Sequence, residues 1–143
     1  MPKIPKTLSN ENRMELVHIY KKRVLRCLND ARDLFESKPY FSVRASYEAV
    51  YHFTVALFIC EGIHIPKTHR GMNSELYSNF VDKGLFPRDI AAHFGQLEND
   101  RNTDQYDPEQ ETTTEIARQN LKKAEAFCEA MQKLVGNLTV LEA

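Results

Sequence analysis

The sequence predicts an all-α protein, an up-and-down bundle of about five helices. Apolar residues recur every three or four positions along most of the chain, and no segment alternates apolar and polar residues as a strand does. Short connections containing Gly or Pro separate the helical runs. With 143 residues, the chain is long enough for one domain with its own core. We assign residues 9–136 to this domain, 1–8 to an N-terminal arm and 137–143 to a C-terminal tail.

The first predicted helix begins near Ser9 or Asn10, both favourable N-cap types, and runs to about Ser37, before Pro39. Its apolar residues follow helical spacing and make one buried stripe: Val17, Tyr20, Val24, Cys27, Ala31 and Leu34. Charged residues occupy the opposite side, so we expect that side to face water.

The second predicted helix covers about residues 41–61 and ends at Gly62, a natural residue after a helix C-terminus. Within its run 49–60, only His52 and Thr54 interrupt the apolar residues. A helix that is apolar nearly all round sits in the middle of a bundle. We therefore place this helix at the centre of the fold.

Glycine and proline set the limits of the next two helices. After a loop at residues 63–70, the third helix covers about residues 72–83 and stops at Gly84. Pro87 fits the first turn of the fourth helix, which runs to about residue 102 or 103.

The last predicted helix begins at a capping box, in which Thr112 is followed three residues later by Glu115. Its apolar positions point inward: Ile116, Leu121, Ala124, Phe127, Cys128, Met131 and Leu134. Gly136 is predicted to end it, which leaves residues 137–143 as the tail.

Composition and charge exclude several classes of protein. With 19 basic and 20 acidic side chains, no global field attracts nucleic acid, so a nucleic-acid partner requires a local site. The apolar run 49–60 is too short to span a membrane, and the first residues lack the apolar core of a secretory signal. Cys27, Cys60 and Cys128 lie far apart and are interpreted as reduced core thiols. We therefore expect a cytoplasmic protein.

The fourth helix carries the most informative position. The apolar stripe of this helix has helical spacing: Ile90, Phe94 and Leu97. The next position of the stripe is Arg101, whose permanent charge must find an anion in a cleft or an interface. One alternative is that Arg101 pairs with Glu98 or Asp104 and closes the helix; the other is that it binds a phosphate. This stripe also favours a homodimer, because one bundle would cover it only in part.

Two further features are open to two interpretations each. The loop residues Lys67, His69 and Arg70 make either a phosphate-contacting loop or a solvated basic loop with Thr68 as a helix cap. His52 is more often a core histidine with one hydrogen bond than a catalytic group. The sequence has no Gly-rich phosphate loop, no metal-ligand motif and no nucleophile elbow, so we expect neither a cofactor nor a metal.

Several short stretches occur together in an order that resembles the small stand-alone HEPN-domain proteins of bacteria and archaea. These stretches are residues 47–52 (YEAVYH), 67–71 (KTHRG), 79–84 (NFVDKG) with Pro87, 101–106 (RNTDQY) and 124–127 (AEAF). They extend over most of the chain, and the first helix fits by pattern only.

The resemblance implies a dimeric bundle, with the Arg-containing segments of two subunits lining one cleft, and RNA or nucleotide chemistry. Catalytic members of the family carry an Arg, a polar residue and then a His, and they cleave RNA without metal. Arg101 and Asn102 match the first two positions, but Tyr106 stands where the His is expected. A phenol with a pKa of about 10 is a poor base near neutral pH. Some family members are toxins neutralised by a nucleotidyltransferase that modifies a tyrosine near this motif, and Tyr106 is a candidate for that modification.

The leading interpretation is a homodimer that binds RNA or a nucleotide through Arg101, Asn102 and Tyr106, supported by Glu98, Asp104 and His52. Such a protein would be a metal-independent endoribonuclease toxin, paired with a nucleotidyltransferase antitoxin, if it cuts RNA. One alternative is a non-catalytic regulatory or partner-binding subunit of a small nucleotidyltransferase. The other is a purely structural helical dimer, with Arg101 in an ion pair between subunits.

Overall fold

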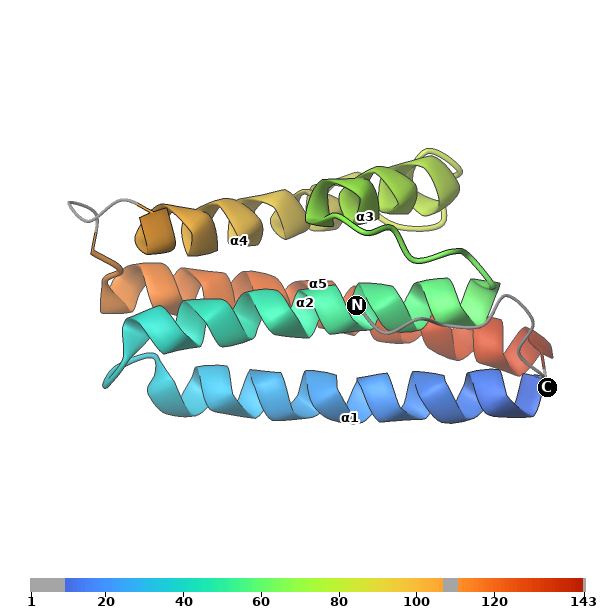
Figure 1. Ribbon diagram of the computed structural model, residues 1–143, viewed down its shortest axis with the longest axis horizontal. Helices are drawn as coiled ribbons and strands as arrows, with labels where there is room; N and C mark the ends of the chain where they lie inside the picture. Colours follow the sequence, from blue (N-terminus) through green and yellow to red (C-terminus); the bar gives the residue numbers. More distant parts are fainter. Residues whose placement is uncertain (1–9, 107–110, 143) are drawn as a thin grey trace.

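The computed structural model describes residues 10–106 and 111–142, with the side chains of residues 11–103 and 111–136. Within these residues every regular element is a helix, which confirms the all-α bundle (Figure 1). The elements are α1 (Asn10–Leu34), α2 (Pro39–Glu61), α3 (His69–Leu76), the π-helical segment η1 (Tyr77–Val81), α4 (Arg88–Tyr106) and α5 (Thr114–Glu142).

The helix α2 lies at the centre, as its apolar sequence predicts. It packs against α1, α4 and α5. Most of its residues are buried, among them Tyr47, Leu57 and Phe58, each with an exposed fraction of 1% or less. It ends where Gly62 takes the left-handed conformation, with φ of 69°.

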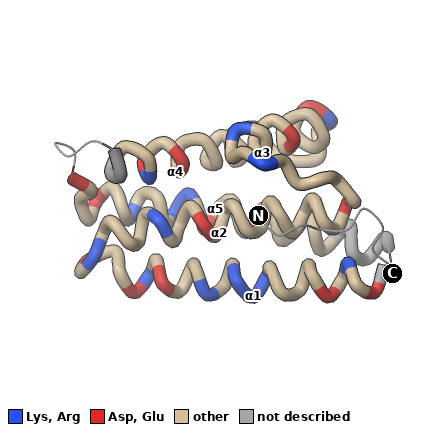
Figure 2. Tube along the Cα trace, in the orientation of Figure 1, with Lys and Arg blue, Asp and Glu red and all other residues tan. Residues whose placement is uncertain are grey.

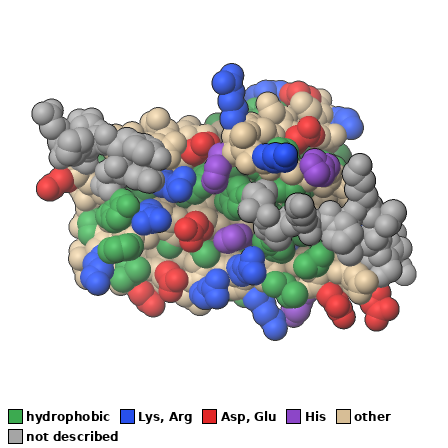
Figure 3. Space-filling model, in the orientation of Figure 1, with side chains coloured by type: hydrophobic (Ala, Val, Ile, Leu, Met, Phe, Trp, Pro, Cys, Tyr) green, Lys and Arg blue, Asp and Glu red, His purple; other side chains and the backbone are tan. Residues whose placement is uncertain are grey.

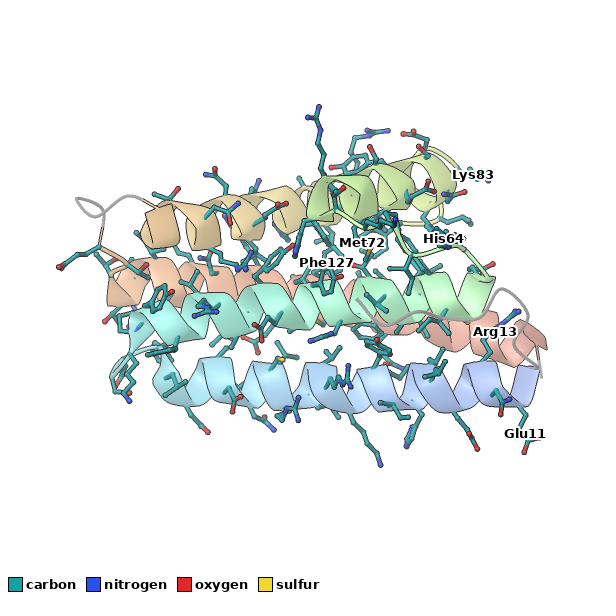
Figure 4. The ribbon with its side chains drawn as sticks, in the orientation of Figure 1. Glu11, Arg13, His64, Met72, Lys83 and Phe127 are labelled. Atoms are coloured by element: carbon teal, nitrogen blue, oxygen red, sulfur yellow. The ribbon has the colours of Figure 1, made fainter. Side chains whose placement is uncertain are left out.

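The helices α3 and α4 form a layer over α2 and α5 (Figure 1). Gly84, with φ of 75°, reverses the chain between η1 and α4. Figure 4 shows Met72 of α3 and Phe127 of α5 between the two layers, and both side chains are fully buried. Phe86 and Phe94 pack on the ring of Phe127, so aromatic contacts join the layers.

The ends of the helices differ in places from the prediction. The helix α5 does not stop at Gly136 but continues to Glu142, so the predicted tail at 137–143 is wrong for residues 137–142. Val135 is fully buried, and the packing there outweighs the cost of about 1 kcal/mol for a helical glycine. The cap is also one residue later than predicted: the hydroxyl of Thr113, not of Thr112, accepts the N–H of Ile116.

The remaining ends shift by a few residues. The helix α1 stops at Leu34 rather than about Ser37, α2 starts at Pro39, and α4 continues to Tyr106. The helix α3 starts at His69, earlier than the predicted residue 72, because the Thr68 side chain accepts the N–H of Gly71 at 2.9 Å. The π-helical turn of η1 was not predicted.

The described side chains show where the basic residues of α1 lie and whether the three cysteines are in the core, as the sequence predicts. Lys and Arg positions group along the middle of α1 (Figure 2). The thiols of Cys27, Cys60 and Cys128 are buried. None of the described helices combines the length and the apolar character that a bilayer crossing requires.

Candidate functional site

Two predicted residues, Arg101 and His69, meet on a tyrosine that the sequence analysis did not single out. The guanidinium carbon of Arg101, on α4, lies 5.2 Å from the centroid of the Tyr47 ring on α2. The hydroxyl of Tyr47 is hydrogen-bonded to Nδ1 of His69, the first residue of α3. Three helices therefore meet at the Arg101 site, which we define as Tyr47 of α2, His69 of α3, and Arg101 and the nearby Glu98 of α4.

Aromatic contacts hold Tyr47 in place. Its side chain is only 1% exposed, and its ring meets Phe94 edge-on at a centroid distance of 5.8 Å. Tyr51, one turn along α2, packs on His69 with ring centroids 4.9 Å apart. Arg101 and His69 are half-buried. The site thus has a rigid, buried floor and two polar groups at the surface.

Arg101 has no carboxylate partner among the described side chains. The ion pairs there are Arg32–Glu125, Arg88–Asp82 and Arg118–Glu115, and none of them includes Arg101. The pairing with Glu98 that the sequence left open is therefore not formed. The side chain of Asp104 lies outside the described residues. Among the described side chains, Arg101 thus contacts the face of a ring and pairs with no carboxylate, a position in which a guanidinium can offer N–H donors to an anion.

Burial sets the protonation of the Tyr47–His69 pair. It raises the pKa of Tyr47 far above its usual value; the Glu98 carboxylate adds to this effect, and Arg101 opposes it. Burial also lowers the pKa of His69, with Glu98 acting against the shift and Arg101 for it. Tyr47 therefore keeps its proton and His69 is neutral near pH 7.

The hydrogen bond then fixes which nitrogen of His69 carries the proton. A buried phenol needs an acceptor, and Nδ1 of His69 is the acceptor that Tyr47 contacts. We assign the bond as O–H of Tyr47 donating to Nδ1. The single proton of the neutral ring is then on Nε2, which makes Nε2 a donor for a ligand rather than a base.

These pKa shifts predict that the free energy of unfolding decreases when the pH is lowered below neutral. Burial lowers the pKa of both His69 and His52 below the ordinary value of 6.5; Arg101 adds to the shift of His69, and Arg23 and Arg26 add to that of His52. Below about pH 6.5 the unfolded chain binds more protons than the folded chain, so the free energy of unfolding decreases as the pH falls. Urea unfolding between about pH 7.5 and pH 5.5 measures this loss.

The substitution His69→Asn should make that loss smaller, because it removes one of the two shifted groups. The matched control is His18→Asn, at an exposed histidine of α1. An equal loss in all three proteins would contradict the assignment of His69 as a buried neutral ring.

Other residues that the sequence singled out are Asn102, Lys67, Arg70 and Tyr106. Asn102 is half-buried directly after Arg101, and Lys67 and Arg70 are exposed on either side of His69. Tyr106 is the last residue of α4, and its side chain lies outside the described residues.

His52 is separated from His69 by Tyr51. Its ring contacts Tyr51 at a centroid distance of 5.7 Å and Tyr20 at 5.8 Å. Its Nδ1 is buried and has no hydrogen-bond partner. The single hydrogen bond expected of a core histidine is therefore not made by Nδ1.

The physical reason given for a dimer does not hold either. Phe94 and Leu97 are fully buried within the single chain and Ile90 is half-buried, so the stripe that leads to Arg101 leaves little apolar surface for a second subunit. The dimer remains a prediction that rests on the family resemblance alone.

A pocket of about 540 Å³ lies elsewhere, between α1 and α5. Its walls include the apolar side chains of Val24, Leu25, Leu28 and Phe53, and charged side chains of both signs line its edges. No residue of the Arg101 site borders it. Within the described part of the chain, no group of three or more His, Cys, Asp or Glu side chains is arranged to hold a metal ion.

This chain is similar to a known domain family and to a bacterial protein. A family model described as the HEPN domain matches residues 17–134, which include every residue of the Arg101 site. A UPF0332 protein of Thermotoga maritima is 26% identical over 125 residues, which is 87% of this chain and 94% of that protein. The matches cover nearly the whole helical bundle.

Proposed function

The chain belongs to the HEPN-domain family, and from that membership we propose that it binds RNA through a phosphate held by Arg101. The observation that carries the proposal is the half-buried guanidinium, which lies on the Tyr47 ring and pairs with no described carboxylate. A guanidinium fork binds two phosphate oxygens at once, so this geometry suits a phosphate of an RNA backbone.

Neighbouring groups add donors and charge around such a phosphate. The Nε2–H of His69 supplies a neutral donor beside Arg101, on the assignment given above. Lys67 and Arg70 are exposed next to His69 and would attract the RNA backbone without reading its sequence. Asn102 would orient the bound phosphate. Glu98 carries a negative charge near the site and would oppose the binding of additional anions.

We propose that the protein binds RNA. Cleavage of the bound RNA would be an additional step, and that step needs a base. Arg101 would stabilise the charge that develops on phosphorus, and either Tyr106 or His69 would move the proton. On our assignment His69 already carries its proton on Nε2, the nitrogen left free by Tyr47, so it is poorly suited to accept one. These considerations favour a protein that holds RNA over one that cuts it.

Binding is tested by fluorescence anisotropy with a labelled single-stranded RNA at a series of salt concentrations. We expect the affinity to fall as salt rises, with a logarithmic slope of about −0.7 for each phosphate contact. Replacing both Lys67 and Arg70 with Ala should make the slope shallower and weaken the binding of every RNA sequence alike.

The control is Lys83→Ala, at an exposed lysine at the far end of the α3–η1 segment, away from the C-terminus of α4 (Figure 4). It removes a positive charge without touching the site and should leave the slope unchanged. If wild-type protein binds no RNA, or binds it independently of salt, the proposed function is wrong. The partner-binding alternative would then be the better interpretation.

A further inference from the structure

We propose that the Arg101 site continues across α2 to α1 as an aromatic strip that holds unpaired RNA nucleotides, with bases on its rings and phosphates at its two Arg ends. The strip consists of Tyr20, His52, Tyr51, His69 and Tyr47, with Arg23 at one end and Arg101 at the other. This inference rests on the proposed RNA binding and specifies its substrate as single-stranded rather than paired RNA.

The seven side chains form an unbroken series of contacts. The guanidinium carbon of Arg23 lies 4.9 Å from the Tyr20 ring centroid, and that of Arg101 lies 5.2 Å from the Tyr47 centroid. Between these ends, successive ring centroids along the strip are 5.8, 5.7, 4.9 and 5.4 Å apart. The series draws on α1, α2, α3 and α4, so the tertiary fold and not one helix assembles it.

Burial divides the strip into supports and a surface. Tyr20 and Tyr47 are 4% and 1% exposed and fix the two ends of the strip in the core. Tyr51, His52 and His69 are half-buried and present ring surface between these ends. A nucleobase stacks on such a surface whatever its identity, because every base has a π-face. Three adjacent rings provide places for two or three bases.

The ends of the strip carry charge suited to a nucleic-acid backbone. Arg23 is exposed, and neither Arg23 nor Arg101 pairs with a carboxylate among the described side chains. Arg26 lies close enough to act on the charge of His52. Figure 3 shows histidine side chains over the middle of the molecule, with Lys and Arg side chains and also some Asp or Glu side chains around them.

This arrangement discriminates between forms of RNA. A mononucleotide can place its phosphate at one end only, whereas a short single strand reaches both. The bases of a duplex are stacked on one another and cannot lie on the rings. Affinity should therefore increase from one nucleotide to about four and be lower for a duplex of the same length.

The test measures binding of labelled adenylate oligomers of increasing length, and of a duplex, to four proteins. Arg23→Ala and Tyr51→Leu should each weaken binding of the four-nucleotide RNA at least about fivefold. The control is Arg88→Ala, whose guanidinium carbon lies 5.7 Å from the Tyr77 ring, so the variant removes the same kind of contact outside the strip.

The outcomes separate this inference from the proposed function. If wild-type protein binds single-stranded RNA and both strip variants bind it equally well, the strip is wrong and the Arg101 site stands. Equal affinity for duplex and single strand also overturns the strip. If no RNA binds, both proposals fail. Thermal melting checks that Tyr51→Leu is folded; should it unfold, Arg23→Ala decides, because that side chain is exposed.

Discussion

Arg101→Ala is expected to weaken RNA binding about ten- to hundredfold while leaving the fold intact. Hydrogen bonds from a charged donor contribute about 1.5–3 kcal/mol each, which corresponds to this change in Kd. The guanidinium has no described ion pair, so its removal leaves no described carboxylate unpaired. The free energy of unfolding should fall by only about 0.5–1 kcal/mol, the contribution of a cation–π contact near the surface.

Binding anisotropy and urea unfolding on the same variant measure both quantities. Arg101→Lys is the second variant, because it keeps the charge but loses the two-pronged donor geometry; it should recover only part of the affinity. Arg88→Ala again serves as the control for loss of charge. A destabilisation of about 3–5 kcal/mol by Arg101→Ala would instead indicate a buried ion pair, as in the purely structural interpretation. Undiminished RNA binding would remove Arg101 from the site.

The sequence predicts the bundle because helical periodicity reports burial directly. The central position of α2 follows from an apolar run that leaves no polar side, and the structure confirms it. A glycine is a less reliable signal of where a helix ends. Gly62 takes a positive φ and ends α2, whereas Gly136 lies inside α5 beside the buried Val135. The two residues are alike in local sequence terms, and only the packing around them separates a helix end from a helix interior.

The candidate site is less predictable because its members come from three helices. Arg101 and His69 could each be selected by type and position, but they are far apart in the sequence, and nothing local indicates that they meet. Tyr47 contacts both of them. Because it lies within an apolar helix, its sequence context indicates a core residue and not a member of a site. The useful signal was the spacing of Tyr47 and Tyr51, one turn apart and therefore on one side of α2.

Tyr47→Ala is expected to cause the largest loss of stability, about 3–5 kcal/mol, because it removes a large buried ring from the core. The same change takes away the support beneath Arg101 and the hydrogen-bond partner of His69. RNA binding should therefore fall along with stability. A matched control is Phe58→Ala, at a fully buried ring that stacks on Phe80 and touches no member of the Arg101 site. It should destabilise the protein by a similar amount and leave the RNA affinity of the folded protein nearly unchanged.

Tyr47→Phe separates the hydroxyl of this residue from its ring. The ring remains under Arg101, so the contribution of the guanidinium to RNA binding should persist, while Nδ1 of His69 loses its donor. Loss of one hydrogen bond should lower the free energy of unfolding by about 0.5–1.5 kcal/mol, much less than loss of the ring. Urea unfolding and RNA anisotropy on Tyr47→Phe, Tyr47→Ala and Phe58→Ala give the comparison. If Tyr47→Ala and Phe58→Ala reduce RNA affinity equally, Tyr47 acts through stability alone. A specific loss with Tyr47→Ala, mostly restored in Tyr47→Phe, would instead assign the positioning of Arg101 to the ring of Tyr47.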